Sequence, residues 1–309
     1  MAESDGNARR ITVRTRDAGQ RIEKLLARTW PDKHWSYVHK LLRQGRVQTD
    51  GIPLQRGQTV WAGQILELLP GGPPAPPLPN GKLRVEVLQA DEDVALVFKP
   101  CGRPVHPGPG HGSDTLLNGL IARFPQLLEL GEERGYGLVH RLDLETSGPL
   151  LVALSPAGYD GLVAQFRERK VEKQYWALVW GDLPDEGVVR APVGDLDAET
   201  RYRVQGRAGR CALVEARPLT GRTHQLRVHF AGLGAPILGD PRYGDGLDDT
   251  TRRLGLPRLA LHCERLACAH PTGGAPLEAL RPAPKVLRKA WGRAQELWGP
   301  QPSAGSGTS

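Results

Sequence analysis

The sequence predicts an α+β protein with a main domain on a mixed, largely antiparallel sheet and a small α/β domain at the N-terminus. In the long C-terminal part, turns join the strand patterns about as often as helices do, which is typical of antiparallel sheets. A proline-rich segment divides the chain early, and the part before it shows two short helical patterns and a hairpin signal. The length of 309 residues also suits two domains of roughly 150 residues each.

The predicted domain boundary is a segment rich in proline and glycine at residues 70–81. Proline lacks a backbone N–H and fixes φ, so this segment is expected to form an extended linker rather than a helix or a central strand. The linker separates a short domain, residues 11–69, from a long one, residues 82–295. The tail, residues 299–309, has almost nothing apolar to bury and is expected to be disordered.

The elements of the short domain follow from its apolar spacing and its turn residues. Asp50 and Gly51 between two short apolar strands predict a hairpin, and residues 65–68 add a further strand. Apolar residues three and four positions apart predict two helices: Ile22, Leu25 and Leu26 in the first, and Val38, Leu41 and Leu42 in the second.

The long domain alternates strands and helices without a regular rhythm. In residues 174–180 the odd-numbered side chains are expected on one face of a strand and the even-numbered ones on the other. Thr223 is expected to cap a helix that ends near Gly234. The other predicted elements are strands at residues 85–88, 94–98, 150–154, 211–216 and 259–263, and helices near residues 114–124 and 156–166.

The positive charge is concentrated in the short domain. The whole chain has a formal net charge of +7. Residues 11–70 contain ten Lys or Arg and five Asp or Glu, which gives +5. A basic helix face suits a phosphate backbone, although the charge alone fits a solvated helix surface equally well. The residues expected to bind RNA in the first case are Lys33, Lys40, Arg43 and Arg46.

Several classes of protein are excluded by composition and motif. No apolar run approaches the roughly 18 residues of a membrane span, and the first ten residues have no apolar signal region. Four cysteines give no disulfide framework, so we expect a cytoplasmic protein without a membrane partner. Cys263 and Cys268, with flanking histidines, suggest either a zinc site or buried structural cysteines, and the strand alternation around them favours the second.

Two polar clusters are candidates for chemistry. Asp143 lies in a charged segment between two apolar stretches and is expected to be partly buried, so it needs a cation or backbone donors. The residues alone fit a structural turn salt bridge as well as an active-site carboxylate. Arg227, one turn into the helix predicted after Thr223, can present its guanidinium to such a carboxylate. His224 and His229 are five positions apart on that helix, so they are not predicted to share a metal ion.

The segment Val-His-Arg-Leu-Asp-Leu-Glu-Thr-Ser-Gly at 139–148 resembles the signature of the RluA/RluD family of RNA pseudouridine synthases. Four more blocks resemble the family in the same order: residues 98–108, 173–179, 221–240 and 261–271. The short domain resembles an S4-like RNA-binding domain, with a basic helix, then Gly-Arg-Val, then a hairpin at Asp-Gly. Together these resemblances imply an isomerase with the pseudouridine synthase fold.

The resemblance also implies roles for particular residues. Asp143 is the essential carboxylate, which attacks the ribose anomeric carbon or assists departure there. Arg141 fills the gap left by a flipped-out uridine, and Tyr175 stacks on the base and helps to remove the proton from carbon 5. Arg227 pairs with Asp143 and keeps it ionised, with Arg222 as the second choice for that pairing. The remaining substrate-binding residues are His140, His224 and Gln225, with Arg222 again among them.

This implied enzyme requires no cofactor and no metal, because the reaction is an isomerisation. Its expected partner is RNA, with large-subunit ribosomal RNA first and tRNA second, and a monomer is expected. A non-catalytic RNA-binding or ribosome-assembly factor with the same fold is the main alternative, and the set Asp143, Tyr175 and Arg227 weighs against it. A hydrolase acting on small molecules through an aspartate nucleophile leaves the basic short domain unexplained.

Overall fold

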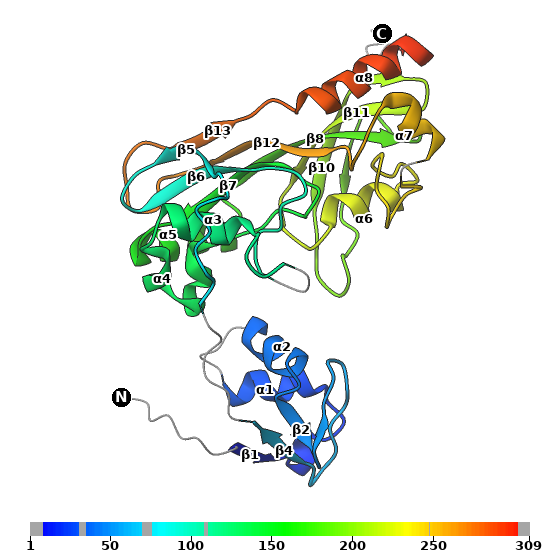
Figure 1. Cartoon of the computed structure of the whole chain (residues 1–309). Helices are drawn as coiled ribbons and strands as arrows, with labels where there is room; N and C mark the ends of the chain where they lie inside the picture. Colours follow the sequence, from blue (N-terminus) through cyan, green and yellow to red (C-terminus); the bar gives the residue numbers. More distant parts are fainter. Residues whose placement is uncertain (1–8, 31–34, 70–75, 108–110, 247, 302–309) are drawn as a thin grey trace. The chain divides into compact units, whose positions relative to one another are not determined.

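The computed structural model describes residues 9–30, 35–69, 76–107, 111–246 and 248–301. The chain divides into two compact units, Met1–Ala75 and Pro76–Ser309, and the division falls inside the segment 70–81 (Figure 1). The predicted α+β class is confirmed, because helices accompany strands whose ladders in the described part of the chain are all antiparallel. No helix among these residues is both long enough and apolar enough to cross a membrane.

The N-terminal unit combines two helices with a four-stranded sheet in the order β1-β4-β2-β3. Both predicted helices and the predicted hairpin are confirmed, and their apolar side chains form one core with Ile22, Leu26 and Leu41 at its centre. The first strand was not predicted. The elements are β1 (Arg9–Thr12), the short 3-10 helix η1 (Thr15–Asp17), α1 (Ile22–Thr29), α2 (Trp35–Arg43), β2 (Val47–Thr49), β3 (Ile52–Pro53) and β4 (Ile65–Leu68).

The C-terminal unit begins with a three-stranded sheet, with β6 (Val94–Lys99) between β5 (Glu86–Ala90) and β7 (Gly148–Ala153). Helices α3 (Leu116–Arg123) and α4 (Leu127–Leu130) pack on one face, and α5 (Pro156–Arg167) packs on the other (Figure 1). Because both faces are covered, β6 and β7 are almost continuously apolar. The predicted N-cap of α5 is confirmed, since the Ser155 hydroxyl accepts a hydrogen bond from the Gly158 N–H.

The second sheet has the order β13-β12-β8-β11-β10-β14, with β9 paired to β10. Its central strand, β8, contains the alternating pattern predicted at residues 174–180. The bounds are β8 (Glu172–Trp180), β9 (Glu186–Val189), β10 (Thr200–Ala208), β11 (Cys211–Pro218), β12 (Leu261–Cys268), β13 (Leu277–Leu280) and β14 (Pro300–Gln301). The remaining helical elements are η2 (Glu132–Gly137), α6 (Gln225–Gly232), α7 (Asp249–Leu254) and α8 (Lys285–Trp298).

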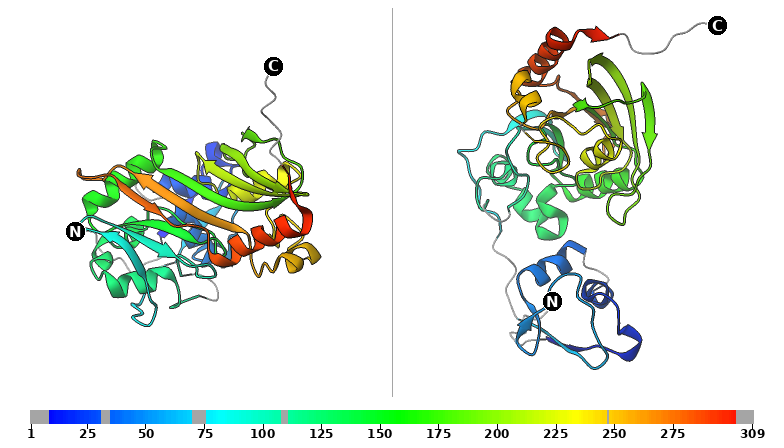
Figure 2. Two further views of the ribbon diagram at one scale, coloured as in Figure 1. Left: turned by 90° about the horizontal axis from the view of Figure 1, so that it is seen from above. Right: turned by 90° about the vertical axis from the view of Figure 1, so that its right-hand side faces the viewer.

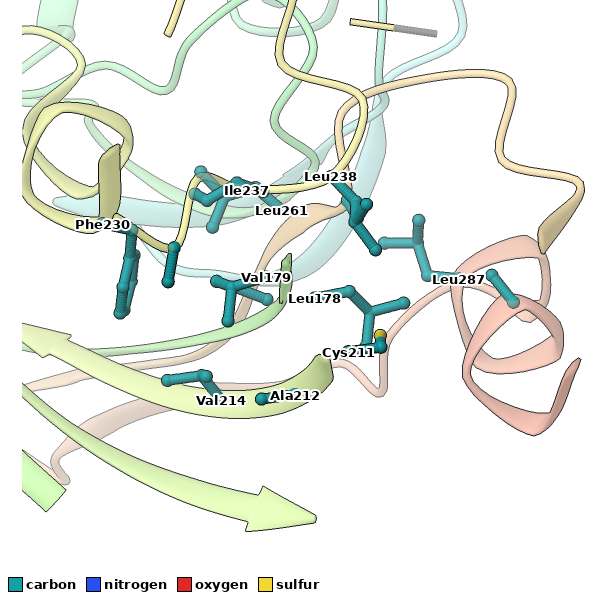
Figure 3. Close-up of a cluster of buried hydrophobic side chains, with 14 of the residues drawn as sticks. Leu178, Val179, Cys211, Ala212, Val214, Phe230, Ile237, Leu238, Leu261 and Leu287 are labelled. Carbon is teal, nitrogen blue, oxygen red and sulfur yellow. The ribbon is translucent and has the colours of Figure 1, made fainter. Parts of the chain in front are cut away.

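Helices α6 and α8 cover different faces of this sheet (Figures 1 and 2). Phe230 of α6 packs edge-on against Tyr202 at 5.7 Å, on the face that Val179 also occupies. Trp298 of α8 lies 5.1 Å from Trp180, which points the opposite way because side chains alternate along β8. Figure 3 shows this core, with Leu287 of α8 beside Leu178 and Cys211. The face under α6 is therefore the one that carries Tyr175.

A close backbone contact joins the two sheets. The Cys263 N–H donates to the Ser147 carbonyl at 2.8 Å, and Gly148 packs directly against Cys263. A Cβ at Gly148 would lie 2.4 Å from the Cys263 carbonyl oxygen, and φ there is +143°, so glycine is required. The buried His262 ring accompanies this contact, with Nδ1 2.8 Å from the Ser147 hydroxyl. The segment before β7 is thereby fixed where the sheets meet.

Two sequence predictions need correction. The predicted disordered tail begins too early, because Pro300 and Gln301 pair with β10 as β14; residues 302–309 lie outside the described part. Thr223 does not cap α6. The helix begins at Gln225 after His224, whose φ of 58° and ψ of 22° are left-handed, and no side chain caps it. The last helical residue is Gly232, and the predicted Gly234 terminates the helix: its φ is 72° and its N–H donates to the Ala231 carbonyl at 3.0 Å. The left-handed residue redirects the chain and so replaces a side-chain cap.

A polar cluster fastens the β5–β6 turn to the β12–β13 turn. Asp93 accepts hydrogen bonds from the hydroxyls of Ser155 and Thr272, and Asp91 lies 2.8 Å from His270 Nε2. The bonds from Ser155 and Thr272 lower the pKa of Asp93 below its usual value. Partial burial raises the pKa of Asp91, but bonds from His270 and backbone N–H groups outweigh this and lower it overall. The cluster therefore needs ionised carboxylates.

We expect this cluster to make stability sensitive to acid. A carboxylate whose folded pKa is lowered stabilises the fold above its unfolded pKa and loses that contribution as the pH falls through the folded pKa. The advantage of the wild type over Asp93→Asn in free energy of unfolding should be full above about pH 4 and should shrink below it. Urea unfolding between pH 7 and pH 2 measures this. An advantage that stays constant over the whole range would contradict the assignment.

Candidate active site

A cavity of about 600 Å³ opens on the face of the sheet that α6 covers. It is lined by residues 139–146, by α5 and its connection to β8, by β8, by the β11–α6 connection with the first turn of α6, and by the start of β12. Cations dominate its charged side chains, and Asp143 is the one acidic side chain among the described lining residues. The lining cations are Arg141, Arg167, Arg169, Lys173, Arg222 and Arg227. Such a cavity attracts an anionic ligand and places a single carboxylate within it.

The segment that carries Asp143 has no regular secondary structure, yet a buried lysine holds it. Lys99, at the end of β6, donates from Nζ to the carbonyls of Leu144 at 3.0 Å and Thr146 at 2.7 Å. Lys99 is completely buried, and this burial lowers its pKa to about 8. The Thr146 N–H also donates to the Asp143 carbonyl at 3.1 Å and closes a turn. The backbone at Asp143 and in the three residues after it is thus fixed.

The Asp143 carboxylate faces two side chains from the α6 region. Its Oδ2 lies 3.8 Å from Arg227 Nη1, and its Oδ1 lies 3.9 Å from His224 Nε2. Its side chain is 18% exposed, so it is partly buried, as predicted. These separations exceed hydrogen-bond distance. The carboxylate is therefore oriented by its neighbours but still accessible from the cavity.

Arg227 makes its short contacts with another carboxylate. Its Nε and Nη2 donate to the two oxygens of Asp240, both at 2.7 Å. Asp240 is completely buried and also accepts the backbone N–H groups of Arg242 and Tyr243. Burial raises the pKa of Asp240, but Arg227 and these N–H groups lower it overall. The predicted pairing of Arg227 with Asp143 is present as an ion pair at 3.8 Å through the remaining Nη1, and the shorter contacts with Asp240 were not predicted.

Tyr175 lies on β8, two residues before Ala177, so it points to the face that α6 covers and lines the cavity with Asp143. Its neighbour across the ladder is Cys263. Burial, the Cys263 thiol and the Asp143 carboxylate together raise the pKa of the Tyr175 phenol well above 10. The phenol is therefore protonated at neutral pH. An apolar ring with a protonated hydroxyl suits an aromatic platform for a planar ligand.

Known proteins share this arrangement of sheets and motifs. A family model described as RNA pseudouridylate synthase matches residues 93–232. The ribosomal large subunit pseudouridine synthase D of Xanthomonas campestris is 34% identical over 320 aligned positions, which cover 94% of each chain. The chain belongs to the RluA/RluD family of RNA pseudouridine synthases. An uncharacterized RNA pseudouridine synthase of Chloroflexus aurantiacus is 37% identical over 94% of this chain and 96% of its own.

A solved structure agrees with this membership. Human RNA Pseudouridylate Synthase Domain Containing 4 has a TM-score of 0.54 and 28% identity, and the match covers 68% of this chain and 93% of that one. The protein is thus an enzyme that isomerises uridine to pseudouridine in RNA. This result favours the isomerase over both alternatives, the non-catalytic assembly factor and the small-molecule hydrolase.

Two residues expected to bind the substrate of this pseudouridine synthase also hold its framework together. Gln225 is buried and uses its whole amide: Oε1 accepts from Thr220 and the Arg222 N–H, and Nε2 donates to Glu199 and Thr200. His140 lines the cavity, but its Nε2 accepts the Leu151 N–H at 2.9 Å. Its burial lowers its pKa to about 3, so the ring is neutral. Both residues therefore have a framework role, and their direct contact with the substrate stays a prediction.

The arginines predicted at the site of the synthase lie at the cavity edge. Arg141 is exposed, and no carboxylate pairs with it in the described part of the chain. Arg222 donates from Nε to the Asp197 carbonyl at 3.0 Å, which ties it to the β9–β10 connection. Arg167 and Arg169, which were not predicted, line the same cavity from the α5–β8 connection. The opening is therefore ringed by guanidinium groups.

The residues predicted to bind RNA belong to the N-terminal unit. Lys40 and Arg43 lie in the last turn of α2, where Arg43 is exposed and Lys40 is half-buried. Arg46 follows the helix and donates to the Leu69 carbonyl at 3.0 Å. Lys33 lies outside the described residues. The structure thus places Lys40 and Arg43 together on one short helix.

Three residues of the site had no predicted role: Lys99, Asp240 and Tyr243. Asp240 follows glycine after an apolar run, and a carboxylate in such a position needs a cation. That rule would have indicated a pairing with Arg227, thirteen residues earlier. Lys99 carried a similar signal, as a lysine that ends an apolar strand. Tyr243 had no signal, because its contact with His224 depends on how the loop after Asp240 folds.

Proposed function

We propose that this enzyme modifies specific uridines in large-subunit ribosomal RNA, with tRNA as the second candidate, and that it works in the cytoplasm. Support comes from relatives named ribosomal large subunit pseudouridine synthase D, in Xanthomonas campestris and Nitrosomonas europaea, which align over 94% and 88% of this chain. We also propose that residues 11–69 form an S4-like RNA-binding domain. The ring of cations around one carboxylate is the observation that carries the proposal for the catalytic unit.

In the proposed mechanism, Asp143 attacks the ribose anomeric carbon. The bond from that carbon to uracil N1 breaks, and its electron pair leaves with the base. The base turns, and carbon 5 bonds to the anomeric carbon while the Asp143 carboxylate departs. A flipped uridine that fills the cavity excludes water from Asp143, and that water would otherwise hydrolyse the intermediate. Atoms and electrons balance without an oxidant or a second substrate.

Tyr175 provides the platform for the detached base. Because its phenol is protonated in the free site, we propose that it gives that proton to N1 and takes the carbon 5 proton in exchange. Arg141, exposed at the cavity edge, is proposed to occupy the space that the flipped uridine leaves. Flipping a base out of a stack costs a few kcal/mol, and a side chain that fills the gap offsets part of that cost.

The decisive experiment maps pseudouridine in ribosomal RNA and tRNA from cells with and without this gene. We expect particular large-subunit sites to lose modification when the gene is absent and to regain it when the wild-type gene returns. A gene encoding Asp143→Asn should not restore them. Sites lost from tRNA alone would replace the ribosomal proposal with the tRNA one. An unchanged pattern in both RNAs would contradict both substrates.

We expect Lys40→Ala combined with Arg43→Ala to weaken RNA binding. Each phosphate contact contributes about 0.9 to the slope of log affinity against log salt on duplex RNA or DNA, so the slope should fall by about 2. Filter binding of ribosomal RNA fragments at several salt concentrations measures it. Arg14→Ala with Arg56→Ala is the matched control, since it removes the same charge from the unit outside α2. Equal losses in both double variants, or no loss in either, would contradict a specific role for α2.

A further inference from the structure

His224 occupies an unusual place beside the catalytic carboxylate. Its backbone is left-handed, with φ 58° and ψ 22°, which is uncommon for a residue other than glycine, although histidine adopts it more readily than most. It does not use its side chain to cap α6, and that side chain lines the cavity instead. Strained backbone that persists beside an active site points to a function for the side chain it directs.

The imidazole is held on its far side by Tyr243. Nδ1 lies 3.0 Å from the Tyr243 hydroxyl, and the two rings meet edge to face at 5.6 Å. Tyr243 is itself fixed, because its N–H donates to Asp240 and its ring lies 5.1 Å from the Arg227 guanidinium. The pair Arg227–Asp240 therefore anchors Tyr243 as well as facing Asp143.

This arrangement selects one tautomer of His224. If Nδ1 carried the proton, the lone pair on Nε2 would face the Asp143 carboxylate 3.9 Å away, which is repulsive. If the Tyr243 hydroxyl donates to Nδ1, Nε2 carries the proton and faces Asp143 as a donor. Burial lowers the pKa of His224, and Arg227 and Arg242 lower it further, against the opposite effect of Asp143 and Asp240. The ring is therefore neutral at neutral pH.

We propose that His224 is a positioning residue whose Nε2–H donates to Asp143 Oδ1 when the uridine is bound, and that Tyr243 sets the tautomer this requires. Arg227 takes the other oxygen, Oδ2. With one donor on each oxygen, the plane of the carboxylate is fixed for attack on the anomeric carbon. A neutral donor achieves this without a second full charge beside Asp143. The inference rests on the proposed roles of Asp143 and the cavity.

The test compares single-turnover tritium release from RNA labelled at uridine carbon 5, with RNA affinity measured separately. His224→Phe removes the donor and should slow release about 100-fold with affinity unchanged. His224→Gln keeps a donor near the position of Nε2 and should recover most of the rate. Tyr243→Phe should slow release about tenfold, as a lost outer partner does. Tyr159→Phe, outside the site on α5, is the matched control and should match the wild type.

The pH profile adds a readout that a purely structural role would not change. Protonation of His224 puts a proton on Nδ1, so Nδ1 can no longer accept the hydrogen bond from the Tyr243 hydroxyl. The wild-type rate should therefore fall as the pH is lowered. His224→Gln should move that fall to lower pH. Equal rates for His224→Phe and wild type, or a glutamine variant as slow as the phenylalanine variant, would overturn the inference. If His224→Phe fails to fold, the pH profile of His224→Gln and the rate of Tyr243→Phe test the inference in its place. Wild type that releases no tritium from any RNA would overturn the proposed function itself.

Discussion

Asp143→Asn should abolish isomerisation while leaving the fold intact. The amide has the same shape as the carboxylate, but it cannot form the covalent bond to the anomeric carbon. Loss of a nucleophile typically costs on the order of 10⁴-fold or more in rate. We expect no tritium release above background from RNA labelled at uridine carbon 5, whereas the wild type releases label.

The binding side of the same experiment separates chemistry from recognition. Asp143 is the one acidic side chain among the described lining residues, so the neutral amide should leave RNA affinity unchanged or slightly higher. Asp160→Asn, on the exposed side of α5, is the matched control and should retain the wild-type rate. Release by Asp143→Asn at the wild-type rate would refute the mechanism.

The elements that the sequence could predict are those whose apolar residues recur at the regular spacing of a helix or a strand. Helices α1 and α2 show their buried faces in the spacing of leucine, isoleucine and valine, and β7 is an unbroken apolar run. Two elements escaped prediction although they have a pattern. Strand β10 alternates buried and exposed positions, but arginines fill the exposed ones and make it look like a connection. Helix α8 buries Leu287, Ala290 and Ala294, and alanines give a weak apolar signal.

The site residues likewise fall into those that a sequence pattern predicts and those that only the folded structure shows. Asp143, Tyr175 and Arg227 were predicted because they lie in motifs, and the structure brings them to one cavity. Which carboxylate takes the short contacts of Arg227 depends on tertiary geometry that no motif encodes. The same holds for Gln225, whose amide is consumed by four framework partners. Sequence indicated which residues gather, and packing decided which atoms remain accessible to the substrate.

Asp240→Ala should be the most destabilising single change at the site. Asp240 is completely buried and the Arg227 side chain is 10% exposed. Removing the carboxylate therefore leaves the Arg227 guanidinium buried without its ion-pair partner. Breaking a buried pair in this way costs about 3–5 kcal/mol. Urea unfolding measures the loss. Glu186→Ala breaks a pair with Arg203 whose side chains are 71% and 69% exposed, and it should cost about 1 kcal/mol or less. Equal losses in the two variants would contradict the buried role.

Asp240→Ala should also lose activity, for a reason other than its lower stability, and a double variant can separate the two effects. Without Asp240, the Arg227 guanidinium is released toward Asp143 and lowers the reactivity of the carboxylate, while Tyr243 loses its anchor. Arg227→Met combined with Asp240→Leu replaces the pair with apolar side chains and should recover most of the stability, since a buried pair is often no better than a well-packed apolar one. It should not recover tritium release, because no donor then faces Asp143 Oδ2. A stable and active double variant would show that the pair is only structural, whereas a stable and inactive one assigns Arg227 to the reaction.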